Sequence, residues 1–198
     1  ASRGRTLVVC PASVIVAWKE QLARFLPTAR VCVYTGPKRR LEPNADFTLT
    51  TYGILRQDSG VLTPTDWDTA ILDEAQTIKN RDSQVAQAAF ELKGRFRIAL
   101  SGTPIENSVD DLVSILAFAC PGAIPASEAR ELDAASLKRR VRPLILRRLK
   151  QDVAPDLPAR TESVLRCTLS TQEREAYSAL AYATQREVAQ WMQNPTGK

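Results

Sequence analysis

Two adjacent carboxylates, Asp73 and Glu74, directly follow the apolar residues Ile71 and Leu72. A buried parallel strand that ends at an active site has this pattern, because chemistry in open α/β sheets gathers at the carboxyl ends of the strands. An Asp there can hold the Mg²⁺ of a nucleotide, and a Glu beside it can orient or deprotonate an attacking water. An ordinary strand end with solvated acids has the same pattern, so this stretch by itself leaves both interpretations open.

A second apolar run, Ala99-Leu100, opens into Ser101, Gly102 and Thr103 before Pro104 stops regular structure. Its two hydroxyls are candidates to lie near a γ-phosphate or near Gln76, which closely follows the acids. Glutamine donates and accepts hydrogen bonds but does not titrate near neutral pH. The alternative interpretation is a capped turn between a strand and a loop.

Strands alternating with helices are expected to position these side chains in a parallel sheet with right-handed crossovers. Short apolar and β-branched runs predict strands at residues 6–10, 30–34, 46–51, 68–73 and 96–101. The first predicted helix is capped by Ser13 and has Trp18, Leu22, Phe25 and Leu26 on one face. Further helices are predicted at 82–93 and 127–142, and one with Leu112, Ile115, Leu116 and Ala119 on one face ends before Pro121. A last helix is predicted at 171–193, where Ser170 and Glu173 form a capping box. Residues 144–146 and 161–169 are candidates for short strands.

The composition describes an ordinary globular chain of 198 residues, with 44% hydrophobic and 25% charged residues. There is no histidine, which excludes His-based triads and His-metal sites, so any metal would be held by carboxylates, water and phosphate, as suits Mg²⁺. The cysteines form no CxxC pair and predict free thiols. The net charge of +5 permits an acidic partner such as nucleic acid without requiring one. No apolar run is long enough to span a membrane, and no signal peptide is recognisable.

Taken together, the Asp73 and Ser101 segments resemble motifs II and III of superfamily-two helicase-like ATPases. Further segments are similar to those of the sucrose-non-fermenting (Snf) family of DNA translocases and chromatin remodellers. They are LVVCPAS at 7–13 as motif Ia, TTYG at 50–53, QTIKN at 76–80 as an extension of motif II, and LRRLKQDV at 146–153 followed by Asp156-Leu157-Pro158. Several motifs in family order are a far more specific signal than one.

The resemblance implies the roles of the site residues. Asp73 would contribute to Mg²⁺ coordination, and Glu74 would activate the hydrolytic water. Gln76 stands where the family more often has His, and Ser101, Gly102 and Thr103 would couple the nucleotide state to the grip on DNA. Adjacent acids on a strand point to opposite faces, which suits a division between metal and water.

The resemblance also implies contacts with the phosphate backbone of double-stranded DNA, which fix position without reading sequence. The residues it points to are Pro11, Ser13, Thr50, Thr51, Lys79 and Asn80. The alternative for Ser13 is a plain helix cap, and for Trp18 core packing is favoured over base stacking. In the basic stretch 138–150, Arg147, Arg148 and Lys150 are candidates for phosphate contact or for docking against a second ATPase lobe, with a solvated surface as the alternative.

The fold class implied is α/β: a partial RecA-like (P-loop NTPase) lobe with a parallel sheet and flanking helices, plus a small, mainly helical C-terminal appendage. We expect the lobe at residues 1–120, and the appendage with a helix leading toward a second lobe at 121–198. ATP-binding loops end in Gly-Lys-Ser/Thr, and the only Gly-Lys here is Gly197-Lys198. By resemblance, that loop precedes motif Ia and the second lobe follows. We therefore expect the chain to be a part of the first lobe that neither binds ATP and Mg²⁺ well nor hydrolyses ATP by itself.

The parent protein is thus predicted to be an ATP-dependent double-stranded-DNA translocase of the bacterial cytoplasm, or of the nucleus if the source is eukaryotic. A strand-separating helicase on DNA or RNA is one alternative, and a non-catalytic binding scaffold that keeps the lobe fold is another. The partners implied are double-stranded DNA and the second lobe, with no membrane. A second copy of the chain is also expected to bind, because a missing phosphate-loop strand would leave neighbouring strands unpaired.

Overall fold

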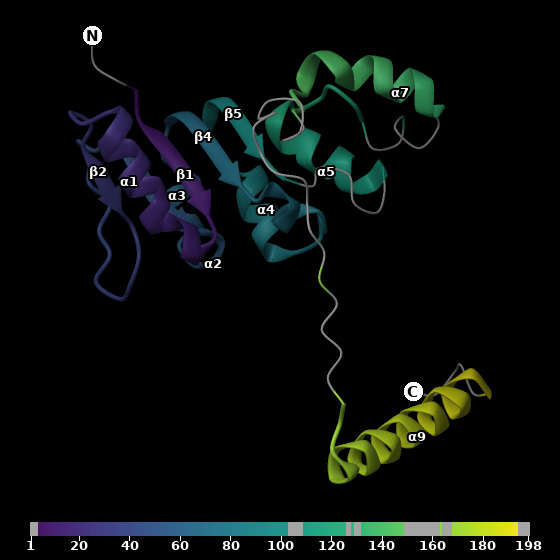
Figure 1. Ribbon diagram of the computed structural model, residues 1–198. Helices are drawn as coiled ribbons and strands as arrows, with labels where there is room; N and C mark the ends of the chain where they lie inside the picture. Colours follow the sequence, from purple (N-terminus) through teal and green to yellow (C-terminus); the bar gives the residue numbers. More distant parts are fainter. Residues whose placement is uncertain are drawn as a thin grey trace. The chain divides into compact units, whose positions relative to one another are not determined.

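A computed structural model describes residues 4–102, 109–125, 128, 132–148, 163 and 168–193. The chain divides into two compact units, Ala1–Arg147 and Arg148–Lys198. The described part of the first unit is built on a five-stranded parallel sheet in the order β2-β3-β1-β4-β5 (Figure 1). The strands are β1 (Thr6–Cys10), β2 (Val31–Val33), β3 (Phe47–Thr51), β4 (Trp67–Asp73) and β5 (Gly94–Leu100), which confirms the predicted strands with small shifts at their ends.

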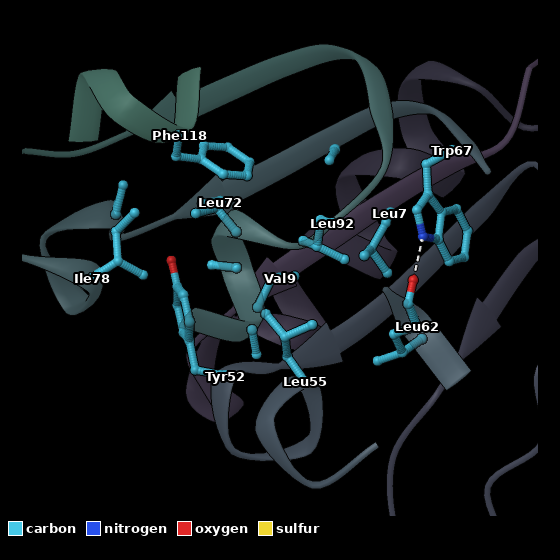
Figure 2. Close-up of a cluster of buried hydrophobic side chains, with 14 of the residues drawn as sticks. Leu7, Val9, Tyr52, Leu55, Leu62, Trp67, Leu72, Ile78, Leu92 and Phe118 are labelled. Atoms are coloured by element: carbon cyan, nitrogen blue, oxygen red, sulfur yellow. Dashed lines mark hydrogen bonds between the residues drawn. The ribbon is translucent and has the colours of Figure 1, made fainter. Parts of the chain in front are cut away.

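Helices cover both faces of this sheet, as the alternation of side chains along β1 requires. Val8 faces α1 (Ile15–Phe25), whose Leu22 and Trp18 pack against it. Leu7 and Val9 belong to the core on the other face. That core is closed by α2 (Tyr52–Gln57), α3 (Ser59–Leu62), α4 (Gln84–Phe90) and α5 (Val109–Ala119) (Figures 1 and 2).

The larger core packs side chains of the sheet against those of the helices. Leu72 of β4 and Phe118 of α5 are fully buried in it (Figure 2). The indole N–H of Trp67 donates to the carbonyl of Leu62 at 2.9 Å, so this large ring loses no hydrogen bond on burial. Each such buried side chain contributes about 1.5–3 kcal/mol, and the core therefore holds β4 in a defined position.

A second, smaller core joins α5 to α7 (Ala134–Val141) and to Ile145, which follows the 3₁₀ turn η3 (Arg142–Leu144). Leu112 and Leu116 of α5 pack there with Leu137 and Val141 of α7. The side chain of Asp133 accepts from the backbone N–H of Ser136 at 2.8 Å and so caps α7. The described residues that make these contacts fall in the first unit, which runs to Arg147. The lobe expected at 1–120 and the appendage expected at 121–198 stay a prediction.

Five local predictions were wrong or too broad. Ser13 does not cap α1: a 3₁₀ turn, η1 (Ala12–Val14), comes first, and α1 shows no side-chain cap. Phe25 points away from the core and is 68% exposed. The helix predicted at 82–93 is only α4, and within 127–142 the described helical stretch of several turns is α7. Leu144 belongs to η3, and Ile145 and Leu146 form no strand.

The described part of the second unit is α9 (Thr171–Gln193), as predicted. The capping box is present: Ser170 N–H donates to the Glu173 carboxylate at 2.8 Å, and Glu173 N–H donates to the Ser170 hydroxyl at 3.3 Å. Tyr177, Leu180 and Val188 are exposed. Of the strand predicted at 161–169, residues 163, 168 and 169 are described and are not extended in a sheet, and the rest lies outside the described residues. No helix in the described ranges has the length and apolar character needed to cross a bilayer.

The sheet has an apolar edge at β5. Phe96, Ile98 and Leu100 are 65%, 42% and 40% exposed. Ile98 is in register with Ile71, which belongs to the core on the α1 side, so the three side chains share that face beyond the reach of α1. The described strands pair continuously from β2 to β5, so unpaired backbone groups lie at the edges and not between neighbours inside the sheet.

Candidate active site

The predicted site residues lie at one edge of the sheet, because all the strands run parallel. Pro11 follows β1, Thr51 ends β3, Asp73 ends β4 and Ser101 follows β5. β1 lies between β3 and β4 in the sheet, so residues distant in sequence meet at this edge. The carboxyl edge is where the ligands of open α/β sheets bind.

Asp73 is held by three hydrogen bonds. Its Oδ2 accepts from the indole N–H of Trp18 at 2.7 Å, and its Oδ1 accepts from the backbone N–H of Glu74 at 3.0 Å. The hydroxyl of Tyr52 donates to the main-chain carbonyl of Asp73 at 2.7 Å. Both the carboxylate and the end of the strand are therefore fixed in one orientation.

Glu74 leaves the strand through a left-handed turn, with φ 53° and ψ 52°. Among the described residues it is the non-glycine with positive φ. This conformation costs roughly 1–2 kcal/mol for a residue with a Cβ, and such strain gathers at functional sites. The turn starts η2 (Ala75–Ile78) and separates the two acids: Asp73 ends the strand, and Glu74 begins the loop.

A chain of hydrogen bonds links Glu74 to the end of β5. Gln76 Nε2 donates to Glu74 Oε2 at 2.6 Å, and the hydroxyl of Ser101 donates to Gln76 Oε1 at 2.7 Å. The two contacts together define the orientation of the Gln76 amide, with its nitrogen toward Glu74 and its oxygen toward Ser101. The predicted proximity of Ser101 to Gln76 is therefore present. Gly102 lies exposed next to Ser101, and Thr103 lies outside the described residues.

A magnesium ion brought by a nucleotide fits this arrangement. The described residues hold no group of three or more His, Cys, Asp or Glu side chains that would bind a metal unaided. Mg²⁺ in nucleotide sites commonly uses one or two carboxylates together with water and substrate phosphates. Each carboxylate oxygen of Asp73 accepts one hydrogen bond and keeps a further lone pair, so Asp73 can supply that carboxylate.

The candidate DNA-contact residues divide into accessible and inaccessible ones. Ser13, Lys79 and Asn80 are exposed at the carboxyl edge, and Pro11 closes the η1 turn through a bond from Val14 N–H to its carbonyl at 3.0 Å. Thr51 caps α2, its hydroxyl oxygen accepting from Ile54 N–H at 3.2 Å.

Thr50 is a correction to the predicted set. It is fully buried, and its hydroxyl donates to the carbonyl of Tyr34 at 3.0 Å, so it cannot reach a phosphate. The alternation along β3 explains this: Thr50 faces the core, while Thr51 already caps the next helix. Arg147 and Arg148 are exposed, and Lys150 lies outside the described residues.

Sequence reasoning did not assign Trp18, Tyr52 and Cys10 to the site. The core packing favoured for Trp18 is confirmed, but its indole N–H also reaches Asp73. Burial, and then the negative charge of Asp73, raise the pKa of the Cys10 thiol to about 11, so this thiol stays protonated at neutral pH. Burial and the same carboxylate also raise the pKa of Tyr52, which keeps its hydroxyl as a donor. For Tyr52 the usable signal was an aromatic residue with a polar tip directly after a strand.

The comparisons with known proteins agree with this geometry. A sequence model described as the SNF2-related domain matches residues 2–197. The chain belongs to this family. Over 89% of its length, this SNF2-related domain is 33% identical to "Chromodomain-helicase-DNA-binding protein 1-like" of Mus musculus, of which it covers 22%. It is 35% identical over 90% of its length to "Putative ATP-dependent helicase/translocase YwqA" of Bacillus subtilis, again covering 22%.

A solved structure shares the fold. The SNF2-related domain matches the SWI2/SNF2 ATPase core of Sulfolobus solfataricus in complex with double-stranded DNA, with a TM-score of 0.70 and 36% sequence identity. The match covers 98% of this chain and 43% of that one. The chain thus has the fold of a RecA-like lobe, and it spans about a fifth of the curated relatives described above.

Proposed function

We propose that this SNF2-related domain is a part of the first ATPase lobe of a protein that couples ATP hydrolysis to movement along double-stranded DNA. The observation that carries the proposal is the chain of hydrogen bonds from Glu74 through Gln76 to Ser101. Beside it, Asp73 accepts three hydrogen bonds that hold its carboxylate and its main chain in place. The relative from Bacillus subtilis supports the proposal because it is described as a putative ATP-dependent helicase/translocase. The structural neighbour supports it because it is an ATPase core in complex with double-stranded DNA.

Each site residue has a role in this proposal. Asp73 holds Mg²⁺, which when bound would neutralise charge developing on the transferred phosphate. Glu74 orients the hydrolytic water and accepts its proton. Gln76 keeps Glu74 in place and connects it to Ser101, so a change at the end of β5 reaches the base directly. In this proposal the nucleotide cradle is a further part of the site, and the described residues supply the metal ligand and the base.

Displacement of a third DNA strand by the full-length protein tests the proposal. A translocase on double-stranded DNA removes the third strand in the presence of ATP and leaves the duplex paired. A strand-separating helicase would unwind the duplex, and a non-catalytic scaffold would do neither. We expect ATP-dependent displacement without unwinding, which the Glu74→Gln variant should not perform.

DNA binding by residues 1–198 is expected to be weak, independent of sequence and steeply dependent on salt. The contacts proposed are Ser13 and Pro11 at the amino end of α1, Thr51, and Lys79 with Asn80 after η2. These residues would contact phosphates. Each neutralised phosphate contributes about −0.9 to the slope of the logarithm of the binding constant against the logarithm of the salt concentration. Titration of unrelated duplexes at several salt concentrations measures both properties.

A pair of lysine variants sharpens this prediction. Lys79→Ala should reduce the magnitude of the salt slope by about 1, since it removes one phosphate contact. Lys93→Ala removes an equally exposed lysine just before β5, at the opposite edge of the sheet, and should leave the slope unchanged. Equal effects of the two variants, or strong preference for one DNA sequence, would contradict the proposed interface.

Self-association of residues 1–198 is also expected, through the β5 edge. Phe96, Ile98 and Leu100 expose apolar surface next to unpaired strand groups, and such edges pair with other chains. Light scattering over a concentration series should show a mass that rises above the monomer. Ile98→Lys should lower it, whereas Val16→Lys, at an exposed apolar position on α1, should not. A mass that stays monomeric at all concentrations would refute this expectation.

A further inference from the structure

Trp18 contacts Asp73 across the largest sequence distance in the site. The two residues are 55 positions apart, and the indole Nε1 lies 2.7 Å from Asp73 Oδ2. The indole N–H can only donate, and a bond to an ionised carboxylate is stronger than one between neutral groups. The contact therefore holds the Asp73 carboxylate in one defined orientation.

Packing fixes the position of the donor. The body of Trp18 lies in the core that α1 forms with the sheet, together with Val8 and Leu22. The indole is thus half-buried against the sheet, and its N–H cannot leave Asp73 without disturbing α1. A phenylalanine at this position would fill most of the same space but would leave Asp73 Oδ2 without its protein donor.

The same helix begins directly behind the η1 turn, which carries the candidate DNA-contact residues Pro11 and Ser13. Trp18 lies about one turn inside α1, so one side chain separates the DNA-facing end of the helix from the proposed magnesium ligand. Tyr52 makes a parallel connection, because it belongs to the first turn of α2 and donates to the Asp73 carbonyl. The helices that follow β1 and β3 therefore each supply a side chain that donates a hydrogen bond to Asp73.

We infer that Trp18 is a positioning residue, which orients the Asp73 carboxylate for Mg²⁺-nucleotide and ties that carboxylate to the DNA-facing helix α1. The inference rests on the proposed function. A role limited to packing would affect stability alone, whereas a positioning role changes how much Mg²⁺ the nucleotide site requires. Partners that orient a ligating side chain typically affect metal affinity by about 10- to 100-fold.

The test uses the full-length protein with Trp18→Phe in a Glu74→Gln background, so that little nucleotide is hydrolysed during the measurement. Binding of a fluorescent ATP analogue is followed while Mg²⁺ is titrated, with EDTA for the metal-free point. We expect Trp18→Phe to raise the Mg²⁺ midpoint about tenfold or more while metal-free binding stays the same. Duplex DNA should also change this midpoint less in the variant than in the protein with Trp18.

Trp67→Phe is the matched control. It removes an indole N–H that bonds to the Leu62 carbonyl in the core, at the end of β4 opposite Asp73. It should lower stability and leave the Mg²⁺ midpoint unchanged. If Trp18→Phe does not fold, benzothienylalanine in place of Trp18 keeps the ring shape and removes only the N–H.

The outcomes separate the inference from the function on which it rests. An unchanged Mg²⁺ midpoint in a folded Trp18 variant, with normal Mg²⁺-dependent binding by the protein that keeps Trp18, would overturn the inference alone. An undiminished effect of DNA would overturn the link to α1. Absence of any Mg²⁺-dependent nucleotide binding by the protein that keeps Trp18 would overturn the proposed function, and the inference with it.

Discussion

Glu74→Gln in the full-length protein is expected to lower DNA-stimulated ATP turnover by about 10²- to 10⁴-fold while nucleotide binding survives. The amide keeps the size of the side chain, and its oxygen can still accept the bond from Gln76 Nε2, so the chain to Ser101 is preserved. What is lost is the basicity that activates water. Phosphate release with and without duplex DNA, and binding of a fluorescent ATP analogue, measure the two properties separately.

Asp73→Ala is the contrasting variant, because it should weaken Mg²⁺-nucleotide binding itself. Residues 1–198 by themselves are expected to show no turnover above that of their own Glu74→Gln variant. If full-length Glu74→Gln kept most of its DNA-stimulated turnover, the assignment of Glu74 as the water-activating base would be wrong.

Phe118→Ala is expected to lower the free energy of unfolding by about 3–5 kcal/mol. Phe118 is fully buried between α5 and the sheet, close to Leu72 (Figure 2). The guanidinium of Arg97 lies 5.6 Å from the centre of its ring, so truncation removes a cation–π contact as well as apolar packing. Domains of this kind are stable by only about 5–15 kcal/mol, so the shift in the urea midpoint should be large.

Phe25→Ala is the control for this measurement, because Phe25 is also a helical phenylalanine but is 68% exposed. It should change the free energy of unfolding by no more than about 0.5 kcal/mol. If both variants had similar effects, α5 would not belong to the core of the sheet as the structure places it.

The sheet could be predicted from sequence because its strands are short runs rich in apolar and β-branched residues. A parallel strand is buried on both faces, so β1 and β4 stand out against the polar segments around them. The change from apolar residues to Asp73, Glu74 and Ser101 marks the carboxyl ends of two strands, and the parallel arrangement brings those ends together. The capping box of Ser170 and Glu173 could also be predicted from sequence, because its two residues are only three positions apart.

Other features depend on which side chains meet in three dimensions, and local patterns do not contain that information. Thr50 and Thr51 look alike in sequence, but the position of β3 between β2 and β1 buries the first and leaves the second to cap α2. Phe25 falls on an apolar helical pattern, yet it is the last residue of α1 and its side chain is exposed.

The sequence by itself determined the strands, the acidic edge and the family, because these are carried by residue types at short spacing. The tertiary structure decided which groups support the acids. Trp18, Tyr52 and Ser101 come from three different elements, and they reach Asp73 and Gln76 only because β1 lies between β3 and β4 and β5 lies beside β4. Sheet order arises from long-range packing, so the bonds that orient the carboxylates appear only once the chain is folded.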